Sequence, residues 1–148
     1  MRWEAVLQTL DWRRVLLCGL VTGFVWTLLS LTLLVLVGGE FLAALPGSRL
    51  RAAGGGLHMF LFFSNLAAGI WALWLYAAIR PGYGPGPKTA VIVGLAWWVI
   101  ISLQSGKWVA LVSMPATPVL APLAATLLAI ILAVMIGAWF YERRPGMQ

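Results

Sequence analysis

The chain contains few side chains that could act as acids, bases or nucleophiles. Its 148 residues include four acidic residues, one histidine and one cysteine. Nucleophilic catalysis needs a hydroxyl or thiol beside a base that a third group orients, and neither the serines nor Cys18 has such neighbours in the sequence. No Asp or Glu lies in the middle of an apolar stretch, so paired-carboxylate hydrolysis and carboxylate metal sites are not expected. The sequence therefore predicts a protein that is not an enzyme.

His58 is the candidate cofactor ligand, because it is the only histidine and it opens an apolar stretch. Helical spacing places it on one face with Phe62, Asn65, Gly69 and Tyr76. A ring nitrogen there could ligate the iron of haem or the magnesium of (bacterio)chlorophyll, with aromatic side chains against the macrocycle. The sequence contains no obvious second ligand or partner carboxylate. The alternative is a histidine at the membrane surface, bonded by water or a lipid headgroup, so no cofactor is predicted outright.

A second polar patch lies near the end of the third apolar stretch. Ser102, Gln104, Ser105 and Lys107 are concentrated there. Lys107 is expected to extend its amine to the membrane surface, and Gln104 could bond to a neighbouring helix. The patch is also a candidate binding site for an anionic lipid or a small solute.

The elements that must position these residues are apolar helices. The chain is 62% hydrophobic and 9% charged, whereas a soluble domain contains roughly 25% charged residues. Most of its apolar surface must therefore face lipid. A helix needs about 20 apolar residues to cross a bilayer, and four stretches reach that length. The sequence predicts an all-α membrane protein, one integral domain over 1–148 with spans at about 15–37, 57–79, 89–110 and 119–141.

The basic residues predict the orientation of these spans. Seven Lys and Arg residues lie on the side of the two termini and of the 80–88 loop, and three lie on the other side. Because Lys and Arg concentrate in cytoplasmic loops, both termini are predicted to be cytoplasmic in a multi-pass inner-membrane protein. The net charge of +6 is spread over the ends of apolar stretches, so nucleic-acid binding is not expected. The outer loop, 38–56, is the longest, and the sequence assigns it no role.

Small residues predict which helix faces pack together, because in lipid they let helix backbones approach closely. Gly19 and Gly23 form a Gly-x-x-x-Gly pair in the first span. The fourth span carries small residues at every fourth position, namely Ala121, Ala125, Ala129, Ala133 and Gly137. The second span offers Ser64 with Ala68 and Asn65 with Gly69 at the same spacing. We expect these faces to point into a compact four-helix bundle, with Leu, Ile and Val toward lipid.

A faint repeat relates the two halves of the chain. Tyr76 precedes Arg80-Pro-Gly82, and Tyr141 precedes Arg144-Pro-Gly146. The repeat indicates either two copies of a helical hairpin or similar chemistry at the same membrane surface.

The segment from Trp74 to Ala90, leading into Gly94-Leu-Ala-Trp97, resembles an uncharacterised family of small bacterial four-helix inner-membrane proteins. The stretches from Arg14 to Leu20 and from Gly137 to Tyr141 also match its pattern. The resemblance implies a four-helix layout in a bacterial inner membrane, and it transfers no catalytic residue.

Three functions remain open from the sequence. The first is a non-catalytic accessory or structural subunit of a larger membrane complex, for example a photosynthetic or respiratory one, in contact with lipids and other membrane proteins. The second is a small oligomeric transporter or channel, which the repeat favours and the lack of charged residues within the spans disfavours. The third is a haem- or chlorophyll-binding protein that uses His58.

Overall fold

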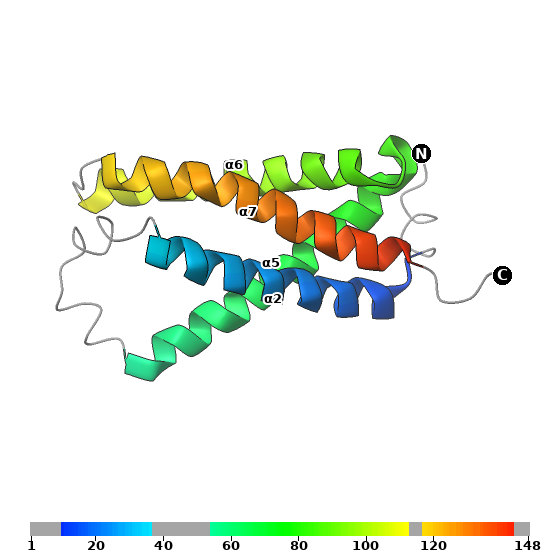
Figure 1. Cartoon of the computed structure of the whole chain (residues 1–148), viewed down its shortest axis with the longest axis horizontal. Coiled ribbons are helices and arrows are strands. Elements are labelled where there is room, and N and C mark those ends of the chain that lie inside the picture. The colour runs from blue at the N-terminus through cyan, green and yellow to red at the C-terminus, as the bar shows by residue number, and fades with distance from the viewer. Residues whose placement is uncertain (1–9, 37–53, 113–116, 144–148) are drawn as a thin grey trace.

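The computed structural model describes residues 10–36, 54–112 and 117–143. Within these ranges it does not describe the side chains of residues 54, 55, 57, 108–112, 117–119 and 121. These residues form four helices and, within that part of the chain, no strand (Figure 1). The helices are α2 (Trp12–Leu36), α5 (Gly54–Tyr83), α6 (Pro87–Val112) and α7 (Thr117–Glu142). The predicted all-α fold with four helices is confirmed. Of the basic residues that supported the orientation, Arg2, Arg49, Arg51 and Arg144 lie outside the described residues, as does most of the 38–56 loop.

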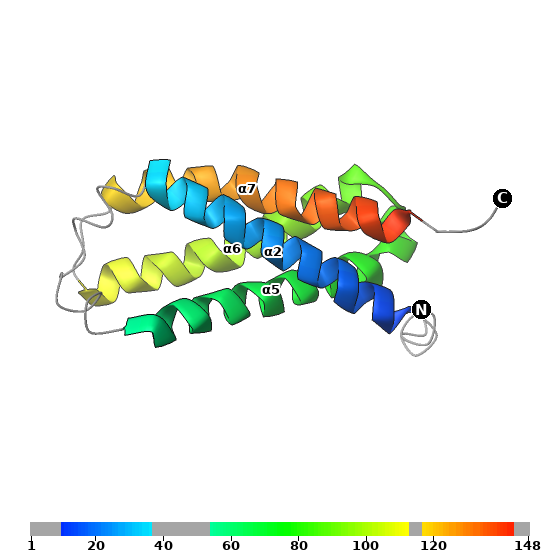
Figure 2. The same ribbon diagram turned by 60° about the horizontal axis from the view of Figure 1, so that its bottom comes forward.

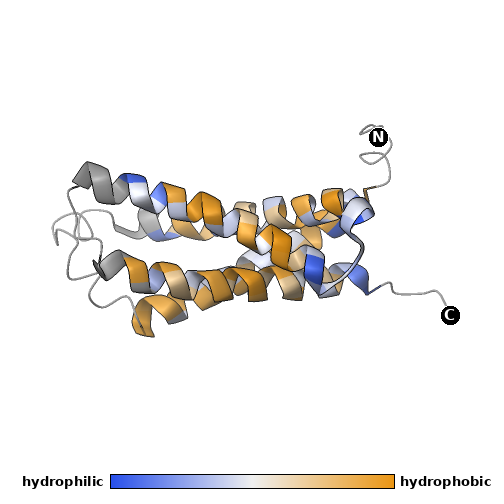
Figure 3. Ribbon diagram, turned by 90° about the horizontal axis from the view of Figure 1, so that it is seen from above, coloured by the Kyte–Doolittle hydropathy of each residue, from blue (hydrophilic) through white to orange (hydrophobic). Residues whose placement is uncertain are grey.

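All four helices are long and apolar enough to cross a membrane. The stretches that meet this condition contain 21 to 26 residues, and their mean hydropathy is 1.5 to 2.5. Only 22% to 33% of the most apolar part of each helix is buried inside the protein. Many large apolar side chains are therefore exposed on the outside of the bundle, and Figure 3 shows apolar residues along all four helices. Such a surface suits lipid and is unfavourable in water.

Successive helices run in opposite directions, so the helix ends lie at the two ends of the bundle. The start of α2, the turn between α5 and α6 and the end of α7 lie together at one end, here called the Gly84 end (Figure 1). The end of α2 and the start of α5 lie toward the other end, here called the opposite end. The two ends of the described chain are thus on the same side of the bundle, whichever way it faces in a membrane.

The α5–α6 connection is shorter than the predicted loop of residues 80–88. Helix α5 continues to Tyr83, and only residues 84–86 separate it from α6. Pro81 is tolerated because it lies in the last turn of α5, where few helical hydrogen bonds depend on it. Gly84 has a positive φ of 85° and its N–H donates to the Arg80 carbonyl over 2.8 Å, which ends the helix. Pro87 then starts α6, a position that needs no N–H donor.

Helices α2 and α5 are in closest contact where three glycines meet. A Cβ on Gly69 of α5 would overlap the backbone of Gly23 and would lie 2.6 Å from the Gly19 carbonyl oxygen of α2. A Cβ on Gly23 would lie 2.6 Å from the Leu66 Cα. Only glycine permits this approach of two backbones, as expected for a Gly-x-x-x-Gly pair in lipid.

The remaining contacts close the bundle. Helix α2 also packs against α7, and α6 packs against α7 and, less extensively, α5. At the α2–α7 contact, a Cβ on Gly137 would overlap the hydroxyl of Thr22. In the centre, the rings of Trp26 and Trp97 lie 5.5 Å apart. The buried core contains Trp26, Ala72, Leu73, Tyr76, Ala90, Val93, Trp97, Ala129, Ile130, Ala133, Val134 and Ala138.

The first half of α5 departs from the bundle. Figures 1 and 2 show α2 crossing α5 obliquely, and Figure 1 shows the start of α5 apart from the other three helices. Met59, Phe60, Leu61 and Phe63 are 50% to 67% exposed. The second half of α5, by contrast, contributes the fully buried Leu73 and Tyr76 to the core. The close contact with α2, which extends from Asn65 to Ile70, therefore separates an uncovered first half of α5 from a packed second half.

Candidate functional site

The polar contacts between helices are concentrated at the Gly84 end, where the last turn of α5 meets the last turn of α7. The Arg80 Nη2 lies 2.7 Å from the Glu142 Oε2 and donates to it. The Tyr76 hydroxyl donates to the Glu142 Oε1 over 3.1 Å and accepts from the Gly86 N–H over 3.0 Å. We call these four residues, Tyr76, Arg80, Gly86 and Glu142, the Arg80–Glu142 cluster.

The Arg80–Glu142 cluster joins three elements through one carboxylate. The Glu142 carboxylate accepts hydrogen bonds from the α5 side chains of Tyr76 and Arg80. The Tyr76 hydroxyl also accepts a hydrogen bond from the Gly86 N–H in the α5–α6 turn. The two ion-paired side chains are 33% and 26% exposed, so the pair is only partly shielded from solvent. Thr89 adds a 2.6 Å hydrogen bond to the Gly84 carbonyl. The arrangement fixes the turn and the end of α7 relative to α5.

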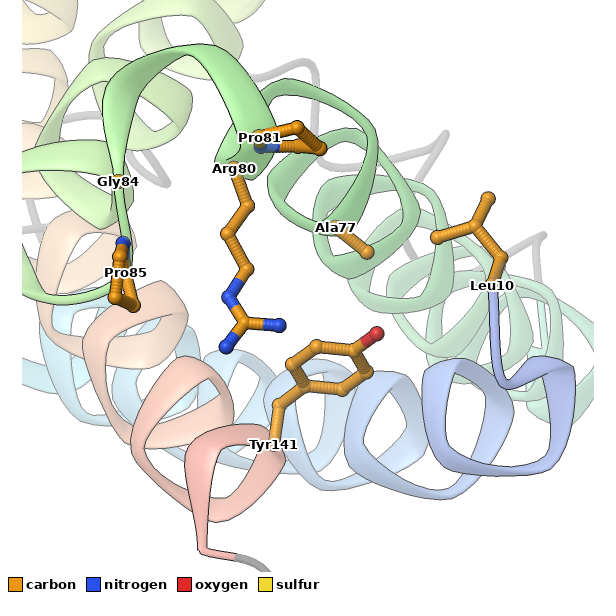
Figure 4. Close-up of a pocket in the computed structure, with 7 residues that line it drawn as sticks. All are labelled: Leu10, Ala77, Arg80, Pro81, Gly84, Pro85 and Tyr141. Atoms are coloured by element: carbon orange, nitrogen blue, oxygen red, sulfur yellow. The ribbon is translucent and has the colours of Figure 1, made fainter. Parts of the chain in front are cut away.

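A pocket of about 380 Å³ lies beside the cluster (Figure 4). Seven described residues line it: Leu10, Ala77, Arg80, Pro81, Gly84, Pro85 and Tyr141. The Arg80 guanidinium projects into the space between the turn and Tyr141. Its Cζ lies 5.9 Å from the centre of the Tyr141 ring, which itself meets the Tyr76 ring edge to face at 6.2 Å. Polar and apolar atoms thus contribute about equally to its walls, and Arg80 is the one charged residue among the described residues that line it.

Further basic residues lie at the Gly84 end of the bundle. Arg13, Lys88 and Arg143 are exposed, and the Arg143 Cζ lies 3.2 Å from the centre of the Trp139 ring. Arg14 lies 3.6 Å from Asp11, and Asp11 also caps α2 by accepting from the Arg14 N–H. Because basic residues outnumber acidic ones here, the described part of this end is electropositive.

The candidate residues for a cofactor or ligand lie elsewhere. His58 is exposed near the start of α5, in the half that leaves the bundle, and it interacts with another part of the chain. Gln104 and Lys107 are exposed near the end of α6. All three are remote from the Arg80–Glu142 cluster, and the structure does not join them into a pocket with it. Within the described ranges, no three His, Cys, Asp or Glu side chains gather as metal ligands would.

The residues expected to mediate packing are at helix contacts. Gly19 and Gly23 are buried against α5, and Gly137 is buried against α2. In α7, Ala129 and Ala133 are buried and Ala125 is half-buried, while the side chain of Ala121 lies outside the description. Gly69, on a face that the sequence predicts to point inward, is buried against Gly23, a partner that its spacing with Asn65 did not identify.

Sequence reasoning missed the Arg80–Glu142 cluster. It interpreted Arg80 as a positive charge that fixes the orientation, and it assigned Glu142 no role. The faint repeat was the available signal, because its two equivalent tyrosines, Tyr76 and Tyr141, are the residues whose rings meet. The equivalent of Arg80 in the second copy, Arg144, lies outside the described residues.

No family model matches the chain, and comparisons with curated proteins and with solved structures likewise find no match.

Proposed function

We propose that this chain is a non-catalytic accessory or structural subunit of a larger complex in a bacterial inner membrane. The observation that supports the proposal best is the uncovered first half of α5. His58, Met59, Phe60 and Leu61 are consecutive and all exposed. Four consecutive residues point to every side of a helix, so the turn of α5 that they form is exposed all round within the described chain.

The uncovered half of α5 is suited to a protein partner that lies in the membrane. It falls within a stretch long and apolar enough to span the bilayer, so the partner must itself be apolar and helical there. Aromatic residues and methionine are enriched at the centres of protein interfaces, and this half of α5 carries Met59, Phe60, Phe62 and Phe63. A different membrane protein whose helices pack against these residues is the proposed occupant.

The lack of ionisable residues inside the spans favours a structural subunit over an ion or proton pump. Between Val15 and Leu36, Met59 and Ile79, Thr89 and Gly106, and Pro122 and Tyr141, the sequence contains no Asp, Glu, Lys, Arg or His. Proton and ion pathways through membranes are usually marked by such residues. The charged cluster at the Gly84 end connects helices to each other and leaves the membrane-spanning interior uncharged.

Site-specific photo-crosslinking in the native membrane tests the docking surface. A photoreactive phenylalanine analogue at Phe63, which is 59% exposed, should form a crosslink to a different membrane protein. The matched control is the same analogue at Leu128 of α7, which is 67% exposed and should meet only lipid. Equal protein crosslinking from both positions, or none from Phe63, would refute the proposal. Crosslinks that join only copies of this chain would favour the oligomeric transporter or channel.

The proposal includes both termini in the cytoplasm. The described Gly84 end carries Arg13, Arg14, Arg80, Lys88 and Arg143, and the described opposite end carries Lys107. The positive-inside rule then favours a cytoplasmic Gly84 end. A C-terminal reporter that is active only in the cytoplasm should give a signal, and a reporter that is active only in the periplasm should not. The reverse result would refute this orientation.

Binding of haem or (bacterio)chlorophyll by His58 is the second candidate. It is favoured by the exposure of His58 on the uncovered half of α5, with Phe62 one turn later and the rings of Phe62 and Phe63 5.6 Å apart. The protein purified from its host in mild detergent should then show a visible absorbance band that His58→Ala removes. A colourless protein refutes this candidate and leaves the subunit proposal intact.

A further inference from the structure

The pocket at the Gly84 end plays no part in the proposed subunit role, and its lining residues suggest a function of their own. Its volume of about 380 Å³ falls in the lower part of the range of roughly 300–1,000 Å³ typical of small-molecule sites. Of its seven described lining residues, only Arg80 carries a charge. The other lining residues are Leu10, Ala77, two prolines, a glycine and Tyr141, and polar and apolar atoms contribute about equally to the wall. A site of this kind selects a small ligand that has one anionic group and some apolar surface.

Arg80 has donors left for a ligand after it has formed its ion pair. A guanidinium carries five N–H donors in a planar fork, and the contact with Glu142 uses the Nη2. Glu142 does not line the pocket. A second hydrogen bond, from the Tyr76 hydroxyl, holds its carboxylate in place. The carboxylate therefore fixes the guanidinium in place while the rest of the fork faces the open space (Figure 4).

The charge around the pocket favours an anion in spite of Glu142. The described residues at this end include five basic side chains, Arg13, Arg14, Arg80, Lys88 and Arg143. They include two acidic ones, Asp11 and Glu142. The excess of positive charge raises the local concentration of anions near the pocket. Basic pockets between membrane helices bind lipid headgroups in this way.

We propose that this pocket binds a phosphate group, with the Arg80 guanidinium shared between the phosphate and Glu142. Phosphate matches the planar fork of arginine, which can donate two parallel hydrogen bonds to two of its oxygens. The apolar walls formed by Leu10, Ala77 and Pro85 suit the glycerol and upper acyl carbons of an anionic phospholipid. A free phosphate ester could use the same donors, so the test separates the two sources. The proposal is independent of the subunit role.

The experiment compares four forms of the full-length chain purified in neutral detergent: wild type, Arg80→Gln, Glu142→Gln and Lys88→Gln. One arm measures retention of phosphatidylglycerol against phosphatidylcholine of equal chain length by native mass spectrometry. The other arm titrates inorganic phosphate and glycerol 3-phosphate at constant ionic strength and follows heat of binding. Lys88→Gln is the matched control, because it removes one exposed positive charge at the same end without touching the pocket.

The variants are expected to act in opposite directions. Loss of a hydrogen-bonding guanidinium should weaken phosphatidylglycerol binding roughly tenfold in Arg80→Gln, as for charged hydrogen bonds elsewhere. Glu142→Gln should strengthen binding several-fold, because it removes the competing carboxylate. Lys88→Gln should change binding by less than about twofold. Both Arg80→Gln and Glu142→Gln break the same ion pair, so damage to the fold alone would shift binding in one direction only.

Each result has a defined meaning. Phosphatidylglycerol binding that depends on Arg80, without binding of the soluble phosphates, identifies a lipid headgroup as the ligand. Arg80-dependent binding of inorganic phosphate or glycerol 3-phosphate identifies a soluble phosphate. Equal losses in Arg80→Gln and Lys88→Gln would show a non-specific effect of surface charge and overturn the proposal. Parallel losses in Arg80→Gln and Glu142→Gln would show a purely structural ion pair and overturn it as well.

Discussion

Replacing Gly69 by alanine tests whether the backbone contact between α2 and α5 holds the bundle together. The new Cβ would overlap the backbone of Gly23 and lie 2.6 Å from the Gly19 carbonyl oxygen. An ordinary contact would be nearly an ångström longer. The obstructing atoms belong to a helix backbone, so no side-chain rotation can relieve the overlap. The two helices must move apart along their most extensive contact.

The magnitude follows from two opposing effects. Overpacking a close contact typically costs about 1–3 kcal/mol, and the rigid backbone neighbours place Gly69 near the upper limit. Alanine is a better helix former than glycine by about 1 kcal/mol, which offsets part of that cost. We therefore expect Gly69→Ala to lower the free energy of unfolding by about 2 kcal/mol.

The matched control is Gly106→Ala in α6. Gly106 is exposed, lies inside a helix and has nothing within 4 Å of the position that a Cβ would take. Only the helix-propensity effect remains there, so this variant should be stabilised by about 0.5–1 kcal/mol. Unfolding in mixed detergent micelles, followed by far-ultraviolet circular dichroism, measures both changes. If Gly69→Ala were as stable as Gly106→Ala, the close backbone contact would not exist and this reasoning would be wrong.

Three further variants address the core, the Gly84 end and its turn, and the same unfolding assay serves for all of them. Ala129→Leu should lower the free energy of unfolding by about 1–3 kcal/mol, because it overpacks a site that is 5% exposed. Ala124→Leu, on the exposed side of α7, should leave the free energy of unfolding nearly unchanged. Equal effects of the two would contradict the assigned inner face. Tyr76→Phe should lower the free energy of unfolding by about 1–2 kcal/mol, because it leaves the Gly86 N–H without its acceptor. Unchanged stability would mean that the turn does not depend on Tyr76. Gly84→Ala should lower the free energy of unfolding by about 1 kcal/mol, because a φ of 85° is unfavourable for alanine. Gly82→Ala, in the last turn of α5, should not lower it. Similar losses of stability in both variants would refute the role of the positive φ.

The four helices could be predicted because length and apolarity alone decide which segments suit a bilayer. The ends of the helices were harder to predict. Pro81 and Gly82 are breakers in water-soluble helices, and they were assigned to a loop. The structure places both in the last turn of α5, where a proline removes little, and leaves the break to Gly84. The segment contains glycines at 82, 84 and 86, and the local sequence does not decide which of them ends the helix.

The Arg80–Glu142 cluster could not be predicted because its members are brought together by helix packing. Arg80 and Glu142 are 62 residues apart, and nothing in their local sequence relates them. Each lies at the end of an apolar stretch, where a charged residue is expected in any membrane protein. Their meeting requires α5 and α7 to end at the same height and on adjacent sides of the bundle. The same reason explains why the small-residue spacing of Gly19 and Gly23 indicated a contacting face without indicating Gly69 as its partner.

The three-glycine crossing also determines where the uncovered half of α5 lies. At the Gly84 end, α5 is fixed to α7 by Glu142 and to the turn by Tyr76. At its middle, Gly69 rests on the backbone of α2. Two such attachments define the line of a helix, so the first half of α5 must continue away from the bundle along that line. The surface proposed for a partner protein is therefore set by the crossing and by the cluster, and a change at either should move it. Gly69→Ala should accordingly reduce crosslinking from Phe63 under conditions in which the bundle is still folded, and unchanged crosslinking would show that the position of α5 is set elsewhere.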